Sequence, residues 1–175
     1  QMSRAYDDHP LAIGEGQTIS QPYVVALMTQ LARPQESHKV LEVGTGSGYQ
    51  AAVISLLVDQ VYSIEIVPGL AENAARLLSE FSYDNVQVRE GDGYQGWPEE
   101  APFDCILVTA APKKAPPPLL DQLAIGGRLV IPVGSTSFTQ TLLVIERTKK
   151  GFQRRNIIPV RFVPMTGEAQ RRQVP

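Results

Sequence analysis

Three acidic residues occur at regular intervals around a glycine-rich stretch, and together they could hold a cation. Glu42 stands two residues before the first glycine of VGTGSG, Glu65 ends the run QVYSIE, and Asp92 lies in REGDGY. Each acid closes or follows an apolar run of the kind that forms a buried strand. If these strands are parallel neighbours, their carboxyl ends meet at one edge of a sheet. The three carboxylates would then face one crevice.

The glycine-rich stretch indicates which ligand such a crevice would hold. Gly44, Gly46 and Gly48 let the chain turn sharply and approach a ligand without a Cβ atom. Tyr49 stands where the dinucleotide fingerprint has its third glycine. Carboxylates beside the turn repel a pyrophosphate and attract an ammonium or a sulfonium. The pattern therefore favours S-adenosylmethionine, which carries both cations and no phosphate, over NAD.

Each acid also has a plainer interpretation. Charged residues are common at strand ends, and Asp92 between two glycines suits an ordinary turn. Glu65, after the second strand, suits a pair of ribose hydroxyls whether the ligand is S-adenosylmethionine or NAD. Three acids in corresponding places favour a shared binding role over coincidence.

A strand–helix alternation predicts the scaffold that positions these residues. Apolar, β-branched runs predict strands at 39–43, 60–66, 85–90, 103–109 and 127–133, and helical spacing predicts helices at 21–32, 48–57, 68–81 and 117–124. Two further strands, 140–148 and 152–164, are joined too tightly for a crossover helix and predict an antiparallel hairpin. The fold class is α/β, with a doubly wound, mostly parallel seven-stranded sheet that ends in this hairpin.

Length and composition predict a single domain over 1–175. We divide it into an N-terminal loop (1–19), a cofactor-binding core (20–134), a C-terminal hairpin with a substrate-side segment (135–167), and a tail (168–175). The net charge of −2 gives no footprint for nucleic acid or an anionic membrane, and the longest apolar run, 51–58, is short for a bilayer span.

Cysteine and histidine usage adds two expectations. The only cysteine, Cys105, cannot form an internal disulfide, so a cytoplasmic location is the default. His9 and His38 lack the spacing of metal ligands, so no metal site is predicted.

Nearly the whole chain, from about Ala5 to Gly167, resembles the protein-L-isoaspartate O-methyltransferase family. The resemblance is carried by 5–23, 40–52, 64–66, 91–104, 108–112, 126–134 and 160–167. Many methyltransferases share the glycine loop, whereas GQTISQPY (16–23) and VPMTG (163–167) are more specific. The resemblance implies a Rossmann-like methyltransferase fold. It also implies transfer of a methyl group from S-adenosylmethionine to the free α-carboxylate of L-isoaspartyl residues in damaged proteins. The products are S-adenosylhomocysteine and an ester that closes to a succinimide and partly reopens to aspartate.

The resemblance also implies roles for individual residues. Glu42 and the loop Gly44, Thr45, Gly46, Ser47 and Gly48 would hold the methionine part of the cofactor, Glu65 the ribose, and Asp92 with Gly93 the adenine. Gln17, Thr18, Ile19 and Ser20 would line the join between cofactor and substrate, with Thr166 near the cofactor. Ser20 falls where the family has its active-site hydroxyl.

Ser20 has a competing interpretation as the N-cap of the helix predicted at 21–32. Such a cap contributes about 1 kcal/mol, and because Pro22 has no N–H, the bond would have to come from Tyr23. The reaction itself needs no general base, since an α-carboxylate is already ionised at neutral pH. We therefore expect Ser20 to orient the carboxylate.

The chain departs from the family pattern at its start. Family members usually carry a helical stretch before the motif that begins here at Ala5, which implies a fragment or a form without that cover. Three rival functions stay open: a methyltransferase with another substrate, an NAD-dependent oxidoreductase, and a non-catalytic binding module on the same fold.

Overall fold

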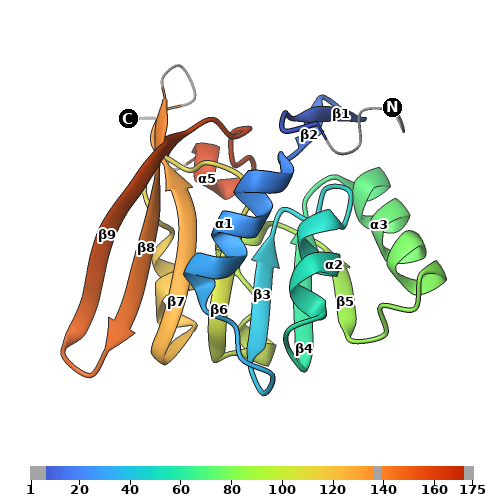
Figure 1. Ribbon diagram of the computed structural model, residues 1–175. Helices are drawn as coiled ribbons and strands as arrows, with labels where there is room; N and C mark the ends of the chain where they lie inside the picture. The colour runs from blue at the N-terminus through green and yellow to red at the C-terminus, as the bar shows by residue number, and fades with distance from the viewer. Residues whose placement is uncertain (1–6, 136–138, 172–175) are drawn as a thin grey trace.

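The computed structural model describes residues 7–135 and 139–171 and is built around a seven-stranded sheet (Figure 1). The strand order is β5-β4-β3-β6-β7-β8-β9. The strands are β3 (Lys39–Val43), β4 (Gln60–Glu65), β5 (Val86–Glu90), β6 (Phe103–Val108), β7 (Leu123–Val133), β8 (Gln140–Thr148) and β9 (Gly151–Val160). The first five pair in parallel, and β8 and β9 add to β7 antiparallel. This confirms the predicted fold class and the C-terminal hairpin.

Helices cover both faces of the sheet. They are α1 (Pro22–Ala32), α2 (Tyr49–Ser55), α3 (Pro68–Glu80), α4 (Pro117–Asp121) and α5 (Glu168–Arg171), with short 3-10 turns η2 (Gly93–Gln95) and η3 (Pro98–Glu100). Three of these helices begin at a proline, where the missing N–H leaves no intrahelical bond unmade. No helix within the described ranges is long and apolar enough to span a membrane.

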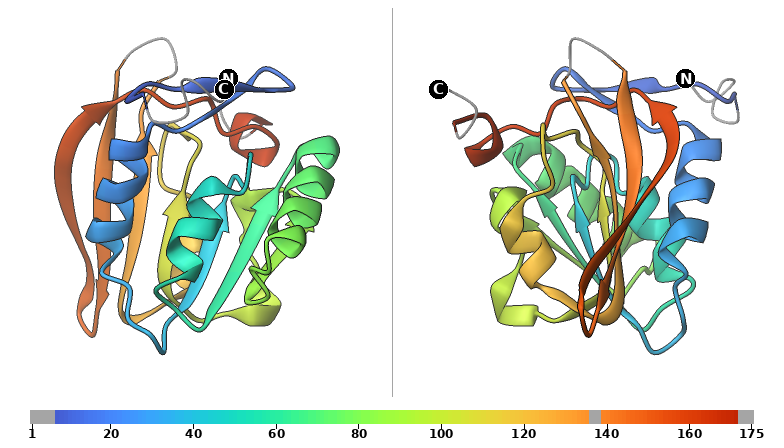
Figure 2. Two further views of the ribbon diagram at one scale, coloured as in Figure 1. Left: turned by 45° about the vertical axis from the view of Figure 1, so that its right-hand side comes forward. Right: turned by 90° about the vertical axis from the view of Figure 1, so that its left-hand side faces the viewer.

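Each face of the sheet has its own hydrophobic core. On one face, α1, α2 and α3 contribute Met28, Ile54 and Leu78 to a buried cluster. On the other face, α4 and α5 contribute Leu119 and Ala169. The right-hand view of Figure 2 shows α1 on one side of the sheet and α4 with α5 on the other. Burial on both faces explains why the parallel strands read as continuous apolar runs.

The carboxyl edge of the parallel strands, at the upper end of Figure 1, is covered by segments from both ends of the chain. A small hairpin of β1 (Leu11–Gly14) and β2 (Gln17–Ile19) lies there, close to the start of α1. The prediction of a plain loop over 1–19 is therefore wrong for residues 11–19, which form this hairpin, whereas 7–10 lie in no helix or strand. Strands of four and three residues are too short to produce a readable alternation, and the glycines that suggested a loop form the hairpin turn.

The start of α1 also differs from the prediction. Its N-cap is Gln21, which makes no side-chain capping bond, so Ser20 is not the cap. The N–H of Tyr23 instead donates to Asp8 Oδ1 at 3.2 Å. A carboxylate from the preceding segment thus supplies the acceptor that the local sequence was expected to provide.

Several boundaries move by a few residues. The helix predicted at 117–124 ends at Asp121, because Leu123 already belongs to β7 and pairs with Phe103. β9 ends at Val160, and the following residues leave the sheet. Val163 and Met165 then bond to Ala111 through main-chain hydrogen bonds of 2.8 and 3.0 Å. These bonds hold the C-terminal segment beside the loop after β6.

Candidate functional site

Three adjoining cavities open at the carboxyl edge of the sheet. The first, here called the Glu65 cavity, is lined among others by Gln17, Thr18, Gly44, Gly46, Glu65, Asp92, Gly93 and Thr166. The second, the Glu42 cavity, is lined among others by Thr18, Ile19, Ser20, Glu42, Gly44, Thr45, Gly46 and Ser47. The third, the β9 groove, includes Ser20 and the stretch from Ile158 to Val163.

The three cavities bring together almost every residue that the sequence singled out. The exception is Gly48, which lines none of them within the described chain. Gly48 is the N-cap of α2 with φ of 82°, and a Cβ there would come within 3.3 Å of Leu78. Its place favours a packing role between α2 and α3.

Glu42 lines its cavity and is fully buried. Its Oε2 accepts a short hydrogen bond from the Ser63 hydroxyl, which in turn lies 2.6 Å from the hydroxyl of Thr45. Its Oε1 has no hydrogen-bond partner among the described residues. Burial raises the pKa of Glu42 to about 8, against the Ser63 bond that lowers it; the negative charge of Glu65 raises it further, and the nearby main-chain N–H of Ala51, which makes no regular hydrogen bond to Oε1, lowers it least. A cation that enters this cavity would give Oε1 an interaction partner. It would also favour the ionised carboxylate over the protonated acid.

Glu65 holds the glycine turn in shape. Its Oε2 accepts the N–H of Gly46 at 2.8 Å, and its Oε1 accepts the N–H of Val67 at 3.0 Å. The side chain is only 5% exposed, yet it lines the first cavity. Each carboxylate oxygen has a second lone pair, so the same group can also accept from a ligand hydroxyl.

Two of the glycines leave space that another part of the protein fills. Gly44 has φ of 97°, and a Cβ there would collide with the hydroxyl of Thr109. A Cβ on Gly93 would collide with a methyl group of the buried Val43. The glycines thus serve close packing of the turn as well as access for a ligand.

Asp92 has a structural role that the sequence raised only as an alternative. Its Oδ1 accepts the N–H of Tyr94, the bond expected of a turn residue, at 3.0 Å. Its Oδ2 accepts the N–H of Glu168 at 2.7 Å, which ties the C-terminal segment to the loop after β5. The tail, to which no role was assigned, therefore helps to hold the wall of the Glu65 cavity; residues 172–175 lie outside the described chain.

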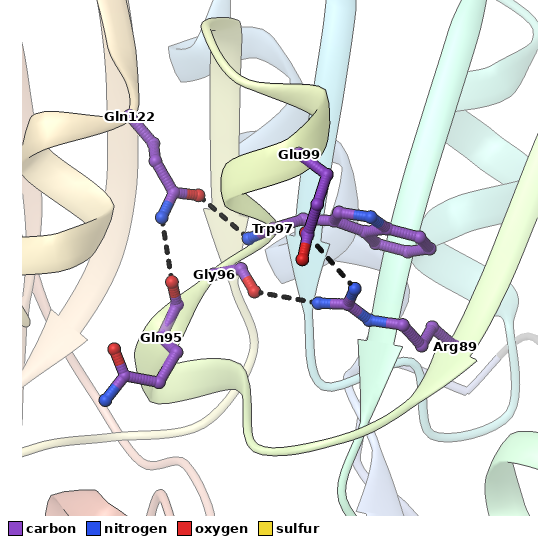
Figure 3. Close-up of polar contacts among 6 residues, drawn as sticks. All are labelled: Arg89, Gln95, Gly96, Trp97, Glu99 and Gln122. Atoms are coloured by element: carbon purple, nitrogen blue, oxygen red, sulfur yellow. Dashed lines mark hydrogen bonds and ion pairs between the residues drawn. The ribbon is translucent and has the colours of Figure 1, made fainter.

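The loop that carries Asp92 and Gly93 continues into Gln95, Gly96 and Trp97, which the side chain of Gln122 holds (Figure 3). The Gln122 side chain donates to Gln95 O and accepts from Trp97 N, both at 2.8 Å. Gly96 lies between these two partners with φ of 66°, and a Cβ there would collide with the Gln122 amide. One buried amide thus fixes the main chain on both sides of a glycine.

Arg89 holds the same loop from the other side. Its guanidinium lies 4.0 Å from the centre of the Trp97 ring, donates to Gly96 O at 3.2 Å, and pairs with Glu99 at 3.4 Å (Figure 3). The Trp97 ring packs edge-on against Tyr62 at 5.1 Å. The loop is therefore a rigid support for the residues that reach the cavity.

Replacing Gln122 by Leu should lower the free energy of unfolding by about 2–4 kcal/mol. The substitution leaves the part-buried N–H of Trp97 and the part-buried carbonyl of Gln95 without their protein partner, and the two losses together cost about 2–4 kcal/mol at about 1–2 kcal/mol each. Urea denaturation measures the change. Gln87→Leu, at an exposed position of β5, is the control, and an equal effect of both variants would contradict the assigned role.

Ser20 lines both the Glu42 cavity and the β9 groove. Since Asp8 occupies the Tyr23 N–H, no helix-capping bond competes for the Ser20 hydroxyl. The residue therefore stands at a passage between two cavities and serves no cap.

Sequence reasoning missed Thr109 and Ser63. Thr109 lines all three cavities and follows directly after β6, so the rule that placed the acids at strand ends could have found it. Ser63 is buried within β4 and reaches Glu42 from the neighbouring strand. A serine inside an apolar strand pattern is a weak signal, and only pairing of the strands gives it meaning.

Comparisons with known proteins agree with this geometry. A family model described as protein-L-isoaspartate(D-aspartate) O-methyltransferase matches residues 1–170. The chain is 59% identical over 169 residues to protein-L-isoaspartate O-methyltransferase 2 of Polaromonas sp., covering 96% of this chain and 80% of that protein. It is 56% identical over 164 residues to the protein-L-isoaspartate O-methyltransferase of Gloeobacter violaceus, covering 94% and 80%.

Solved structures give the same picture. One protein-L-isoaspartate O-methyltransferase superposes with a TM-score of 0.89 at 31% identity, over 97% of this chain and 56% of that one. A second, from Plasmodium falciparum and in complex with S-adenosyl-L-homocysteine, gives a TM-score of 0.78 at 28% identity, over 92% and 81%. This chain thus spans little more than half of the first solved chain and most of the second.

Proposed function

The chain belongs to the protein-L-isoaspartate O-methyltransferase family, and from its site we propose that it methylates the free α-carboxylate of L-isoaspartyl residues in damaged proteins. The methyl donor is S-adenosylmethionine, and the product is S-adenosylhomocysteine. The ester formed on the substrate then closes to a succinimide, which begins the repair.

The observation that carries the proposal is the buried, unpaired carboxylate oxygen of Glu42 beside a glycine turn. A ligand with a pyrophosphate would meet a second acid, Glu65, whose oxygens hold the same turn. A ligand with an ammonium group and no phosphate instead supplies the missing partner. The residues present therefore fit S-adenosylmethionine and disfavour NAD.

Assignments of individual residues follow from the cavities that they line. Glu42 would hold the ammonium group, with Gly44, Thr45, Gly46 and Ser47 around the methionine part, and Gly48 supporting this turn through α2. Glu65 would accept from the ribose hydroxyls, and Asp92, Gly93 and Thr166 would line the base. Gln17, Thr18, Ile19 and Ser20 would form the join to the β9 groove, which would receive the substrate.

The chemistry asks the protein for orientation and dryness. When bound, S-adenosylmethionine supplies a methyl group on a positively charged sulfur. The substrate carboxylate is already ionised, so no side chain has to remove a proton. Holding the two reactants in line can lower the barrier by about 7–11 kcal/mol. Because two opposite charges disappear in the reaction, a site that keeps water out favours the transition state further.

A neutral donor suits the carboxylate better than a cation does. An arginine fixed on the carboxylate would stabilise the reactant and oppose its loss of charge. The hydroxyl of Ser20, at the passage between the Glu42 cavity and the β9 groove, can orient the carboxylate through one hydrogen bond. The covering hairpin brings Ile13 to within 3.3 Å of where a Cβ of Gly46 would lie, and so helps to exclude water.

A matched pair of peptides tests the proposal. The chain is incubated with methyl-labelled S-adenosylmethionine and either an L-isoaspartyl peptide or its ordinary aspartyl twin. We expect base-labile methyl ester on the isoaspartyl peptide alone. Equal labelling of both peptides, or labelling of neither in a chain that binds S-adenosylhomocysteine, would assign the site to another substrate or to a binding module. A thermal shift with NAD and none with S-adenosylhomocysteine would favour an oxidoreductase.

Partners and location are extensions of this proposal. Proteins and peptides with isoaspartyl residues are the expected substrates, and neither nucleic acid nor a membrane is expected as a partner. The cytoplasmic location stays a prediction from cysteine usage. The division of the chain into four parts is a proposal as well.

A further inference from the structure

Thr109 stands where the three cavities meet. Among the described residues, only Thr18 and Thr109 line the Glu65 cavity, the Glu42 cavity and the β9 groove together. If the proposed function holds, the first two cavities take the two halves of the cofactor and the groove takes the substrate. The transferred methyl group must then pass the junction that these two residues border.

The surroundings of the Thr109 hydroxyl determine what it can offer. Its Oγ1 lies 3.1 Å from Val43 O and 2.5 Å from Gly44 O, and both of these oxygens are acceptors. The hydroxyl has one proton to donate to them, so its own lone pairs are used by neither partner. The oxygen also occupies the space that a side chain at position 44 would need, so it lies directly against the glycine turn that lines the Glu65 and Glu42 cavities.

An oxygen with available lone pairs suits a sulfonium methyl group. The C–H bonds next to a positive sulfur carry partial positive charge, and a neutral oxygen can accept them as weak hydrogen bonds. A carboxylate at the same place would compete with the substrate or be methylated itself. A threonine hydroxyl fixed by two carbonyls avoids both.

We propose that Thr109 contacts the transferred methyl group and holds it in line between the cofactor and the substrate carboxylate. The proposal rests on the proposed function for its substrate. Its contact with the methyl position can be measured without any substrate.

The test compares two ligands that differ at that position. S-adenosylhomocysteine has no group where the methyl stands, whereas the analogue sinefungin carries a protonated amine on carbon there. In Thr109→Val, which keeps the shape and removes the hydroxyl, we expect sinefungin affinity to fall by about tenfold or more. The affinity for S-adenosylhomocysteine should stay within about threefold. Thr109→Ser, which keeps the hydroxyl, should bind the two ligands with the wild-type ratio of affinities. Calorimetric titration gives both dissociation constants.

A purely structural role predicts a different result. If Thr109 only braces the turn at Gly44, Thr109→Val weakens both ligands equally and lowers the melting temperature. That outcome, or an unchanged ratio of the two affinities, overturns the proposal. Should the valine variant fail to fold, the same ratio of the two ligand affinities is measured for Thr109→Ala. If the wild-type chain labels no isoaspartyl peptide, the proposed function is contradicted. The ratio of the sinefungin and S-adenosylhomocysteine affinities still tests whether Thr109 contacts the methyl position.

Turnover adds a second readout. With an isoaspartyl peptide at saturation, Thr109→Val should lower kcat by about tenfold while the KM for S-adenosylmethionine changes little. A raised KM with unchanged kcat would instead indicate bracing of the cofactor turn. The two readouts must agree for the proposal to stand.

Discussion

Glu42→Gln is expected to weaken S-adenosylhomocysteine binding by about a hundredfold at a pH of about 8 or above. The side chain is fully buried, and one of its oxygens has no partner among the described residues. The ammonium group of the ligand would lose the carboxylate that lines the Glu42 cavity, while the amide keeps the volume of the acid. Isothermal titration measures the loss. Glu90→Gln, at an exposed position of β5, is the matched control and should change nothing.

The same variant should change the pH dependence of binding. Burial raises the pKa of Glu42 to about 8, so the free protein must release this proton before the carboxylate can meet a cation. The affinity of the wild-type chain should therefore rise with pH until about 8, by up to about tenfold per unit. In Glu42→Gln this rise should disappear. An unchanged pH profile in the variant would assign the dependence to another group.

The free energy of unfolding should fall as the pH rises, whereas the affinity for the ligand should increase. Because the pKa of Glu42 in the folded chain lies above its ordinary value of 4.5, the folded state binds the extra proton between 4.5 and about 8. The stability that the folded state gains from this proton is complete below a pH of 4.5 and is lost as the pH rises through about 8. Glu42→Gln should remove this loss and leave the ligand-free protein more stable than wild type in alkaline solution, by about a few kcal/mol. Urea denaturation across the pH range measures it.

Ser20→Ala should lower kcat on an isoaspartyl peptide by about 10- to 100-fold, which is the range for losing a hydrogen bond to a charged group. Ser20 lines both the Glu42 cavity and the β9 groove, so its hydroxyl can reach a carboxylate in the groove. The affinity for S-adenosylhomocysteine should stay largely intact. Steady-state kinetics and titration together give the two values.

In Ser20→Ala, a loss of kcat is not confused with the loss of a helix cap. Gln21 is the N-cap of α1 and Asp8 accepts the Tyr23 N–H, so Ser20→Ala should cost little stability. Ser37→Ala, at an exposed turn, is the control for the substitution itself. Loss of stability without loss of kcat would return Ser20 to a structural role, and unchanged values of both would deny it any role in transfer.

Much of the fold could be predicted from the sequence because its signals are local or strongly periodic. The strands at 39–43 and 140–148 match β3 and β8 at both ends, since continuous apolar, β-branched runs have few other stable conformations. The position of Glu42, Glu65 and Asp92 at one edge followed from parallel pairing alone. The family resemblance named the donor and the substrate, which no periodicity can do.

What the sequence could not decide depends on contacts between distant residues. The acceptor at the start of α1 is Asp8, fifteen positions from Tyr23, and no capping rule extends that far. Asp92 meets Glu168 across seventy-six positions, so its second role was invisible in REGDGY. Thr109 and Gly44 come together because β3 and β6 are neighbours in the sheet although 65 positions separate them in the chain.

The sequence by itself therefore determined the seven strands of the main sheet, the order along the chain of these strands and of four of the helices, and the chemical character of the site. Hydrophobic periodicity and strand-end acids are properties of short segments, so they can be recognised without knowing how the rest of the chain folds. Only the tertiary structure decided which oxygen of Glu42 lacks a partner and which side chain fills the turn at Gly44. Burial and hydrogen-bond pairing are set by groups that meet only when the chain is folded.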